Sequence, residues 1–145
     1  MMNAQPAHRD LVGYRVVAVH AHPDDEAITT GGTLADLTAR GADVCVVTCT
    51  LGEQGEVIGE TYQHLVADDA DQLGGFRIGE LQQSLASLGA RGVFLGGAGR
   101  FRDSGMAGSA SSTHPRAFIN SGLTAVQLLA DVFRAEQPHL VITYG

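Results

Sequence analysis

Four short apolar runs alternate with helical segments along this chain, and this alternation restricts its fold more than any other feature. The runs are continuously apolar, as in strands buried on both faces, and they cover residues 14–20, 43–50, 92–96 and 139–144. Apolar residues at helical spacing mark residues 27–40, a long segment that ends at Gly89, and a stripe from Ile119 to Phe133. The pattern predicts an α/β fold, a Rossmann-like parallel sheet of four strands with helices on both faces.

The remaining segments carry further expectations. Residues 1–12 are expected to form a loose tail, and residues 13–145 the N-terminal part of a single α/β domain. We expect Gly74-Gly75 to interrupt the second helical segment and residues 97–115, rich in Gly and Ser, to form a long surface loop. The chain stops directly after its fourth strand, where parallel sheets place their functional loops, so a truncated domain is expected. An uncovered sheet edge and exposed helix faces then predict self-association.

The charge balance excludes several kinds of partner. Lys and Arg total 9 against 16 Asp and Glu, a net charge of −7, and no basic cluster is available for a nucleic-acid backbone. No stretch reaches the roughly 20 apolar residues of a membrane span, and the N-terminal residues lack the apolar core of a signal peptide. We therefore expect a cytoplasmic protein without nucleic-acid or membrane partners, in which Cys45 and Cys49 are reduced, buried thiols.

Titratable side chains crowd the carboxyl end of the first strand. The stretch HAHPDDE carries two imidazoles and three carboxylates, and its proline stiffens the loop. His22 and Asp25 are close enough in sequence to ligate one divalent ion, with zinc the first choice and iron(II) the alternative. Asp24 would then be free to accept a proton from water. His20 is either a further ligand or an imidazole packed behind the site.

Other interpretations of this stretch are open from the residues alone. PDDE is also a common helix start, because the helix dipole favours carboxylates there. HAHPDD is one residue away from the HxHxDH motif of metallo-β-lactamase-like hydrolases, and amidohydrolase barrels also carry an HxH pair. The alternation of strands and helices argues against the metallo-β-lactamase fold, which begins with antiparallel strands. No GxGxxG follows the first strand, and LGGAGR lacks the Lys-Ser/Thr of a phosphate-binding loop, which argues against a nucleotide site.

Four motifs resemble those of one enzyme family. AHPDDE after a valine-rich strand resembles the signature of the LmbE-like, or PIG-L-type, zinc deacetylases. Three further stretches resemble the branch that deacetylates an N-acetylglucosaminyl-inositol in mycothiol biosynthesis: VVTCTLGEQGEVIGE, ADQLGGFRIGEL and LGGAGRFRDSGMAG. Mycothiol S-conjugate amidases and other PIG-L-type N-acetylglucosamine deacetylases are the alternatives. The resemblance implies one zinc ion as cofactor and, as substrate, a small acetylated amino sugar linked to inositol.

The resemblance also implies roles for individual residues. His22 and Asp25 match zinc ligands, and Asp24 matches the general base. Three more positions match substrate-binding residues, namely Arg77, Asp103 and Glu56. From the residues alone, Arg77 could instead form a surface ion pair, and Asp103 could stabilise a turn.

The family's third zinc ligand and its oxyanion-stabilising histidine belong to an HPDH-type motif that this sequence lacks. His64, His114 and His139 are expected at positions that cannot replace it. Two hypotheses follow. The chain is a metal-dependent deacetylase or the N-terminal half of one, or it is a non-catalytic α/β fragment that folds without metal.

Overall fold

The structure, a computed structural model, describes residues 8–144 and is built around a four-stranded sheet. The strand order is β3-β2-β1-β4, and every neighbouring pair is parallel. The strands are β1 (Arg15–His20), β2 (Asp43–Thr48), β3 (Arg91–Phe94) and β4 (Leu140–Ile142). The helices are α1 (Asp25–Ile28), α2 (Gly31–Ala39), α3 (Leu73–Leu88) and α4 (Gly122–Glu136), with short 3-10 helices η1 (Gln63–Leu65), η2 (Ala110–Thr113) and η3 (Phe118–Asn120).

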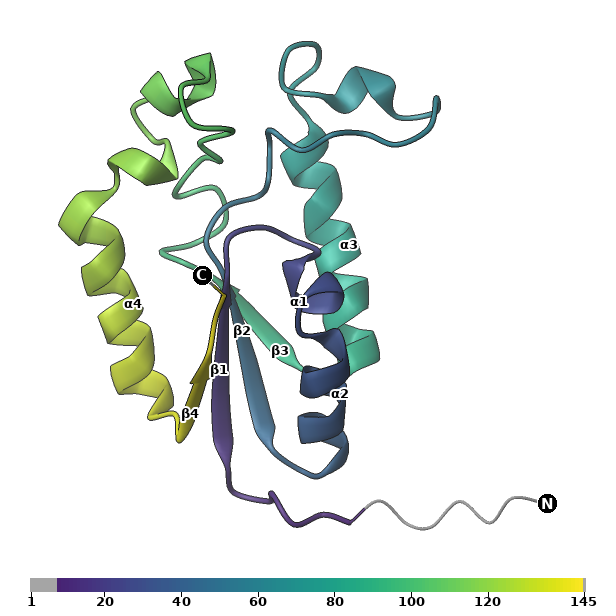
Figure 1. Cartoon of the computed structure of the whole chain (residues 1–145), viewed down its shortest axis with the longest axis vertical. Helices are drawn as coiled ribbons and strands as arrows, with labels where there is room; N and C mark the ends of the chain where they lie inside the picture. Colours follow the sequence, from purple (N-terminus) through teal and green to yellow (C-terminus); the bar gives the residue numbers. More distant parts are fainter. Residues whose placement is uncertain (1–7, 145) are drawn as a thin grey trace.

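Two apolar cores, one on each face of the sheet, hold the helices in place. Successive strand residues point to opposite faces, so neighbouring valines of β1 and β2 enter different cores. The first core joins Val16 and Val46 to Leu34 of α2 and Leu81 of α3. The second core packs the opposite face of the strands against α4, with the buried residues Val17, Cys45, Val47, Cys49, Leu95, Phe101 and Ala125. Figure 1 shows α2 and α3 on one side of the sheet and α4 on the other, which confirms the predicted fold class.

The strand order reverses between β1 and β4. The chain runs from β1 to β2 and β3 in one direction, and α4 then returns it to the other side of β1, where β4 pairs. In open parallel sheets the crevice outside the carboxyl ends at such a reversal is the usual ligand site. His20 ends β1, so the titratable stretch begins at this reversal (Figure 1).

The helix predicted for residues 27–40 is in fact two helices. The hydroxyl of Thr29 donates to the carbonyl of Asp25 at 2.6 Å, and the hydroxyl of Thr30 donates to the carbonyl of Glu26 at 3.2 Å. Threonine hydroxyls that bond to backbone carbonyls compete with regular helix, which accounts for the break between α1 and α2.

Two loop predictions also need correction. Gly74-Gly75 does not interrupt a helix, because both residues lie in the first turn of α3 and the chain before it is irregular apart from η1. Close packing favours glycine at position 74, since a Cβ there would lie 3.0 Å from the Cβ of Leu51. The loop at residues 97–115 is not purely on the surface, because Phe101 and Asp103 are buried.

Part of the predicted tail is attached to the fold. Leu11 packs against the first core, and its N–H donates to the carbonyl of Arg40 at 3.0 Å. Asp10 accepts hydrogen bonds from the Arg40 guanidinium at 2.6 and 3.0 Å. Residues 1–7 lie outside the described residues, and the domain that begins at residue 13 stays a prediction.

An ion-pair cluster ties the amino ends of β2 and β3 to the end of α4. Arg91 donates to Asp43 at 2.9 Å and also pairs with Glu136. These hydrogen bonds hold the pKa of both carboxyl groups below their usual values of 3.8 and 4.5.

Several large apolar side chains stay exposed on β4, η3 and α4. Strand β4 exposes Leu140 and Val141, η3 exposes Ile119, and α4 exposes Leu123 and Val126. Among residues 8–144, no helix combines the length and apolar character that a bilayer crossing requires.

Candidate active site at the carboxyl end of β1

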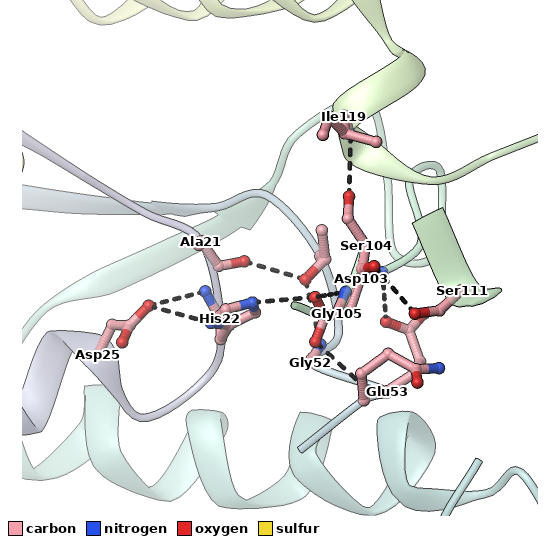
Figure 2. A network of polar contacts seen from close by, with 12 residues as sticks. Ala21, His22, Asp25, Gly52, Glu53, Asp103, Ser104, Gly105, Ser111 and Ile119 are labelled. Carbon is pink, nitrogen blue, oxygen red and sulfur yellow. Dashed lines mark hydrogen bonds and ion pairs between the residues drawn. The ribbon is translucent and has the colours of Figure 1, made fainter. Parts of the chain in front are cut away.

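His22 lies between two carboxylates, as Figure 2 shows. Its Nδ1 is 3.7 Å from Asp25 Oδ2, and its Nε2 is 3.3 Å from Asp103 Oδ1. The backbone N–H of His22 also donates to Asp25 Oδ2 at 2.9 Å, which folds Asp25 back towards the histidine. The hydrogen bond to Asp103 raises the pKa of His22 against the opposing effect of burial. The structure therefore brings together the two residues that the sequence predicts as metal ligands.

The spacing of His22 and Asp25 fits two ligands of one ion. Zinc binds imidazole nitrogen and carboxylate oxygen at about 2.0–2.2 Å, and tetrahedral geometry then separates the two donor atoms by about 3.4 Å. The separation between Nδ1 and Oδ2 is 3.7 Å, close to that value. Asp103, at the other ring nitrogen, is the kind of carboxylate that orients a ligating histidine. Within residues 8–144, no cluster of three or more His, Cys, Asp or Glu side chains could hold an ion, so the described part of the chain supplies two donors.

Next to His22 and Asp25, the carboxylate of Asp24 is bound by Arg77. Its Oδ2 accepts from Arg77 Nη2 at 2.7 Å, and its backbone φ of 100° lies in the left-handed region. Burial raises the pKa of Asp24, and the positive charge of Arg77 opposes the rise. A raised pKa brings a carboxylate closer to the value that suits proton transfer near neutral pH.

A pocket of about 310 Å³ opens beside Asp24. Glu56 and Arg77 contribute to its polar wall, and Tyr62 and Phe76 line it with rings whose centroids are 4.8 Å apart. Glu56 therefore shares a pocket with the proposed base. Its substrate-binding role stays a prediction.

Arg77 is bonded to protein groups on several sides. Its Nη1 donates to the carbonyl of Gly52 at 2.8 Å, and its Nη2 donates to the carbonyl of Pro23 as well as to Asp24. A Cβ at Gly52 would lie 2.0 Å from Nη1, so the close approach requires glycine. The guanidinium thus ties the loop after β1 to the loop after β2. Its substrate-binding role stays a prediction.

Asp103 is buried and turned towards His22. Its Oδ1 accepts from the N–H of Gly105 at 3.0 Å, and its Oδ2 accepts from the N–H of Gln54 at 3.3 Å. Burial acts to raise the pKa of Asp103, but the bonds from His22 and from the backbone outweigh it and lower the pKa. The structure gives Asp103 a clear partner in His22, whereas its predicted place in a sugar pocket stays a prediction.

Two residues of the site were not predicted. The buried Glu53 accepts from the N–H of Asp103 at 2.9 Å. The hydroxyl of Tyr144 donates to Asp25 Oδ2 at 2.5 Å and accepts from the N–H of Ala21 at 2.7 Å. Burial and the bond to Asp25 raise the pKa of Tyr144 to about 12. The position of Tyr144 in the sequence could have pointed to the site, since residues that follow neighbouring parallel strands meet at one edge of the sheet. Nothing in the sequence marks Glu53.

His20 is packed behind the site. Its Nε2 lies 3.0 Å from the hydroxyl of Thr30, and its ring stacks on Tyr144 with centroids 5.2 Å apart. Burial lowers its pKa. His139 is remote, because its Nδ1 accepts from the N–H of Arg15 at the other end of the sheet.

Sequence comparison connects this chain to deacetylases. A family model described as "PIG-L: GlcNAc-PI de-N-acetylase" matches residues 17–145. A protein of Corynebacterium efficiens named 1D-myo-inositol 2-acetamido-2-deoxy-alpha-D-glucopyranoside deacetylase is 70% identical over 138 residues, which cover 95% of this chain and 44% of the relative. A protein of the same name from Rhodococcus opacus is 64% identical over 132 residues, 90% of this chain and 45% of its own length. The chain thus spans about half the length of the curated relatives it matches.

Solved structures show the same fold at low sequence identity. The N,N'-diacetylchitobiose deacetylase from Pyrococcus horikoshii superposes with a TM-score of 0.66 at 24% identity, over 97% of this chain and 43% of that one. The zinc-inhibited form of teicoplanin deacetylase Orf2 gives a TM-score of 0.59 at 24% identity, over 89% of this chain and 55% of that one. The family model matches residues 17–145, which is most of the chain, so this chain belongs to the PIG-L, or GlcNAc-PI de-N-acetylase, family.

Proposed function

We propose that this chain carries half of the catalytic site of a zinc-dependent N-deacetylase that hydrolyses the acetamide of an N-acetylglucosaminyl-inositol. The observation that carries the proposal is the distance of 3.7 Å between His22 Nδ1 and Asp25 Oδ2, with the carboxylate of Asp24 on the same loop. The names of the relatives that are 64–70% identical supply the substrate class, and the motif resemblance places the proposed reaction in mycothiol biosynthesis.

Each side chain has a chemical task in this proposal. A zinc ion, when bound, supplies Lewis acidity for the acetamide carbonyl and lowers the pKa of water. His22 and Asp25 hold the ion, and Asp103 fixes the orientation of His22. Asp24 accepts a proton from the attacking water and later donates it to the departing amine, so that the C–N bond breaks and acetate leaves.

The surroundings of the reaction are also proposals. The substrate, an acetylated amino sugar linked to inositol, would occupy the pocket that Asp24, Glu56 and Arg77 line. We place the protein in the cytoplasm, because Cys45 and Cys49 are free, buried thiols and disulfides belong to oxidising compartments. Iron(II) is the alternative ion, since it accepts the same ligand types.

Zinc binding tests the first half of the proposal. We expect the 145-residue chain to bind one zinc ion in competition with a chromophoric chelator, and His22→Ala or Asp25→Ala to weaken binding by at least 10-fold. His64→Ala is the matched control, because His64 pairs with Asp69 on an exposed surface. Equal zinc affinity in all variants would contradict the assignment of the ligands.

Deacetylation tests the second half. A chimaera in which this chain replaces the matching segment of the Corynebacterium efficiens relative provides a chain of that relative's full length. We expect the chimaera to release acetate from N-acetylglucosaminyl-inositol, and Asp24→Ala to abolish release while zinc affinity is kept. Retained hydrolysis in that variant would remove Asp24 from the mechanism.

A non-catalytic α/β fragment is the second candidate. It is favoured by the finding that, among residues 8–144, no group of three or more His, Cys, Asp or Glu side chains is arranged to hold a metal ion. Absence of zinc binding by the 145-residue chain at micromolar free metal would support this candidate over the first.

A further inference from the structure

Glu26 is the one acidic residue of the HPDDE stretch without a role in the proposed reaction. Its carboxylate is fully buried, with 0% of the residue exposed. A carboxylate is costly to bury unless hydrogen bonds compensate for lost water. The contacts that compensate Glu26 therefore indicate what it does.

Both oxygens of Glu26 are engaged, and they join two separate parts of the chain. Oε2 accepts from the backbone N–H of Asp24 at 3.0 Å. Oε1 accepts from the hydroxyl of Ser84 on α3 at 2.5 Å. The carboxylate thus anchors the Asp24 backbone to a long helix that packs in the first core.

Asp24 needs such an anchor, because its backbone conformation is unfavourable. Its φ of 100° is one that residues with a Cβ rarely adopt, and such strain persists only where neighbouring structure enforces it. Arg77 holds the carboxylate of Asp24 at 2.7 Å, and Glu26 holds its N–H. Glycine would relieve the strain at this position, but it would remove the carboxylate that the reaction needs.

We propose that Glu26 is a positioning residue, whose hydrogen bonds to Asp24 N–H and Ser84 keep the Asp24 carboxylate aimed at the substrate pocket. The inference rests on the proposed function, in which Asp24 is the base. It requires two hydrogen-bonding atoms at position 26 rather than a negative charge.

Substitutions at positions 26 and 84 separate geometry from charge. In Glu26→Gln the amide oxygen can accept from Asp24 N–H while the amide NH₂ donates to Ser84, so both links are kept. Glu26→Leu removes both links at similar volume. Ser84→Ala removes only the anchor on α3, and Ser87→Ala is its matched control, because Ser87 bonds only to the carbonyl of Gln83 on its own helix.

Two measurements report on positioning. In the 145-residue chain, NMR amide exchange at Asp24 is expected to stay slow in Glu26→Gln and to accelerate at least 10-fold in Glu26→Leu. In the chimaera, kcat is expected to fall on the order of 10- to 100-fold in Glu26→Leu, because a small displacement of a catalytic group has effects of that size. KM and zinc affinity should stay within about threefold of wild type, and Ser84→Ala should lower kcat while Ser87→Ala should not.

Several outcomes would overturn the proposal. Wild-type kcat in Glu26→Leu, or a loss in Glu26→Gln as large as in Glu26→Leu, would show that these hydrogen bonds do not position the base. If Glu26→Leu does not fold, equal kcat in Ser84→Ala and Ser87→Ala would overturn it in the same way. If the wild-type chimaera releases no acetate, the proposed function fails, and unchanged Asp24 exchange in Glu26→Leu would then separately reject the anchoring role.

Discussion

The strained backbone at Asp24 leads to a stability prediction that needs no activity assay. Asp24→Gly and Asp24→Ala both remove the carboxylate from Arg77, so they lose the same ion pair. The Asp24 side chain makes no hydrogen bond that caps α1, so no capping energy separates the two variants. In the folded state, they differ in how well position 24 tolerates a φ of 100°. We therefore expect Asp24→Gly to be the more stable of the two.

The size of the difference follows from two opposing effects. A non-glycine residue in a sparsely populated region costs about 1–3 kcal/mol, which glycine avoids. Glycine also gains conformational entropy in the unfolded chain, which offsets about 0.4–1 kcal/mol of that benefit. A net difference of about 1 kcal/mol remains, or about 3 °C in Tm for a chain of this size.

Urea denaturation followed by circular dichroism measures the difference directly. Both variants should unfold with the same m-value, and the midpoint of Asp24→Gly should be higher. Equal midpoints, or a higher midpoint for Asp24→Ala, would refute the idea that the loop forces residue 24 into the left-handed region.

Three further predictions follow from other parts of the fold. Gly52→Ala should lower the free energy of unfolding by more than about 2 kcal/mol, because its Cβ would lie 2.0 Å from Arg77 Nη1 at a φ of +65°. Gly75→Ala is the control, because a Cβ there meets nothing within 4 Å, and it should raise the free energy of unfolding by about 0.5 kcal/mol. Equal effects of the two variants in denaturation curves would contradict the clash at position 52. Arg91→Ala should cost about 1 kcal/mol near neutral pH, since its pairs are partly exposed. Its two carboxylate partners have lowered pKa values in the folded state, so their stabilisation is present above their usual values of 3.8 and 4.5 and is lost as the pH falls through the folded-state values. The variant and wild type should therefore converge in acid, and a gap in stability that does not narrow as the pH falls would refute this. Finally, the 145-residue chain should self-associate through its exposed apolar side chains, and Leu123→Lys on α4 should shift it towards monomer in analytical ultracentrifugation; a monodisperse wild-type monomer would contradict this prediction.

The fold was predictable because it depends on patterns that are local in sequence. Continuous valine-rich runs specify buried parallel strands, and the helical stripes between them specify the crossovers. The proximity of His22 and Asp25 was predictable for the same reason, since the two residues are three apart just after a buried strand, whereas their role as metal ligands stays a prediction. The break between α1 and α2 was not, because it depends on which way two threonine hydroxyls turn.

The long-range contacts of the site could not be read from periodicity. Asp103 reaches His22 from an irregular loop, and such a loop has no repeat from which its path can be deduced. The same holds for Glu53, which bonds the backbone of Asp103. These contacts are set by how the loops after β2 and β3 pack on one another at the carboxyl end of the sheet.

Helix α3 does carry a signal for the rest of the site. Leu81 and Leu85 mark the stripe of α3 that faces the first core, and Arg77 and Ser84 fall on that same stripe at helical spacing. A polar side chain at a core-facing helical position needs a buried partner. Both partners lie just after β1 in the chain: Arg77 binds the Asp24 carboxylate, and Ser84 binds the buried carboxylate of Glu26 in α1, which holds the Asp24 backbone. The core stripe of α3 therefore has two functions along one face, because its leucines fix the helix to the sheet and its two polar members fix the proposed base to the helix.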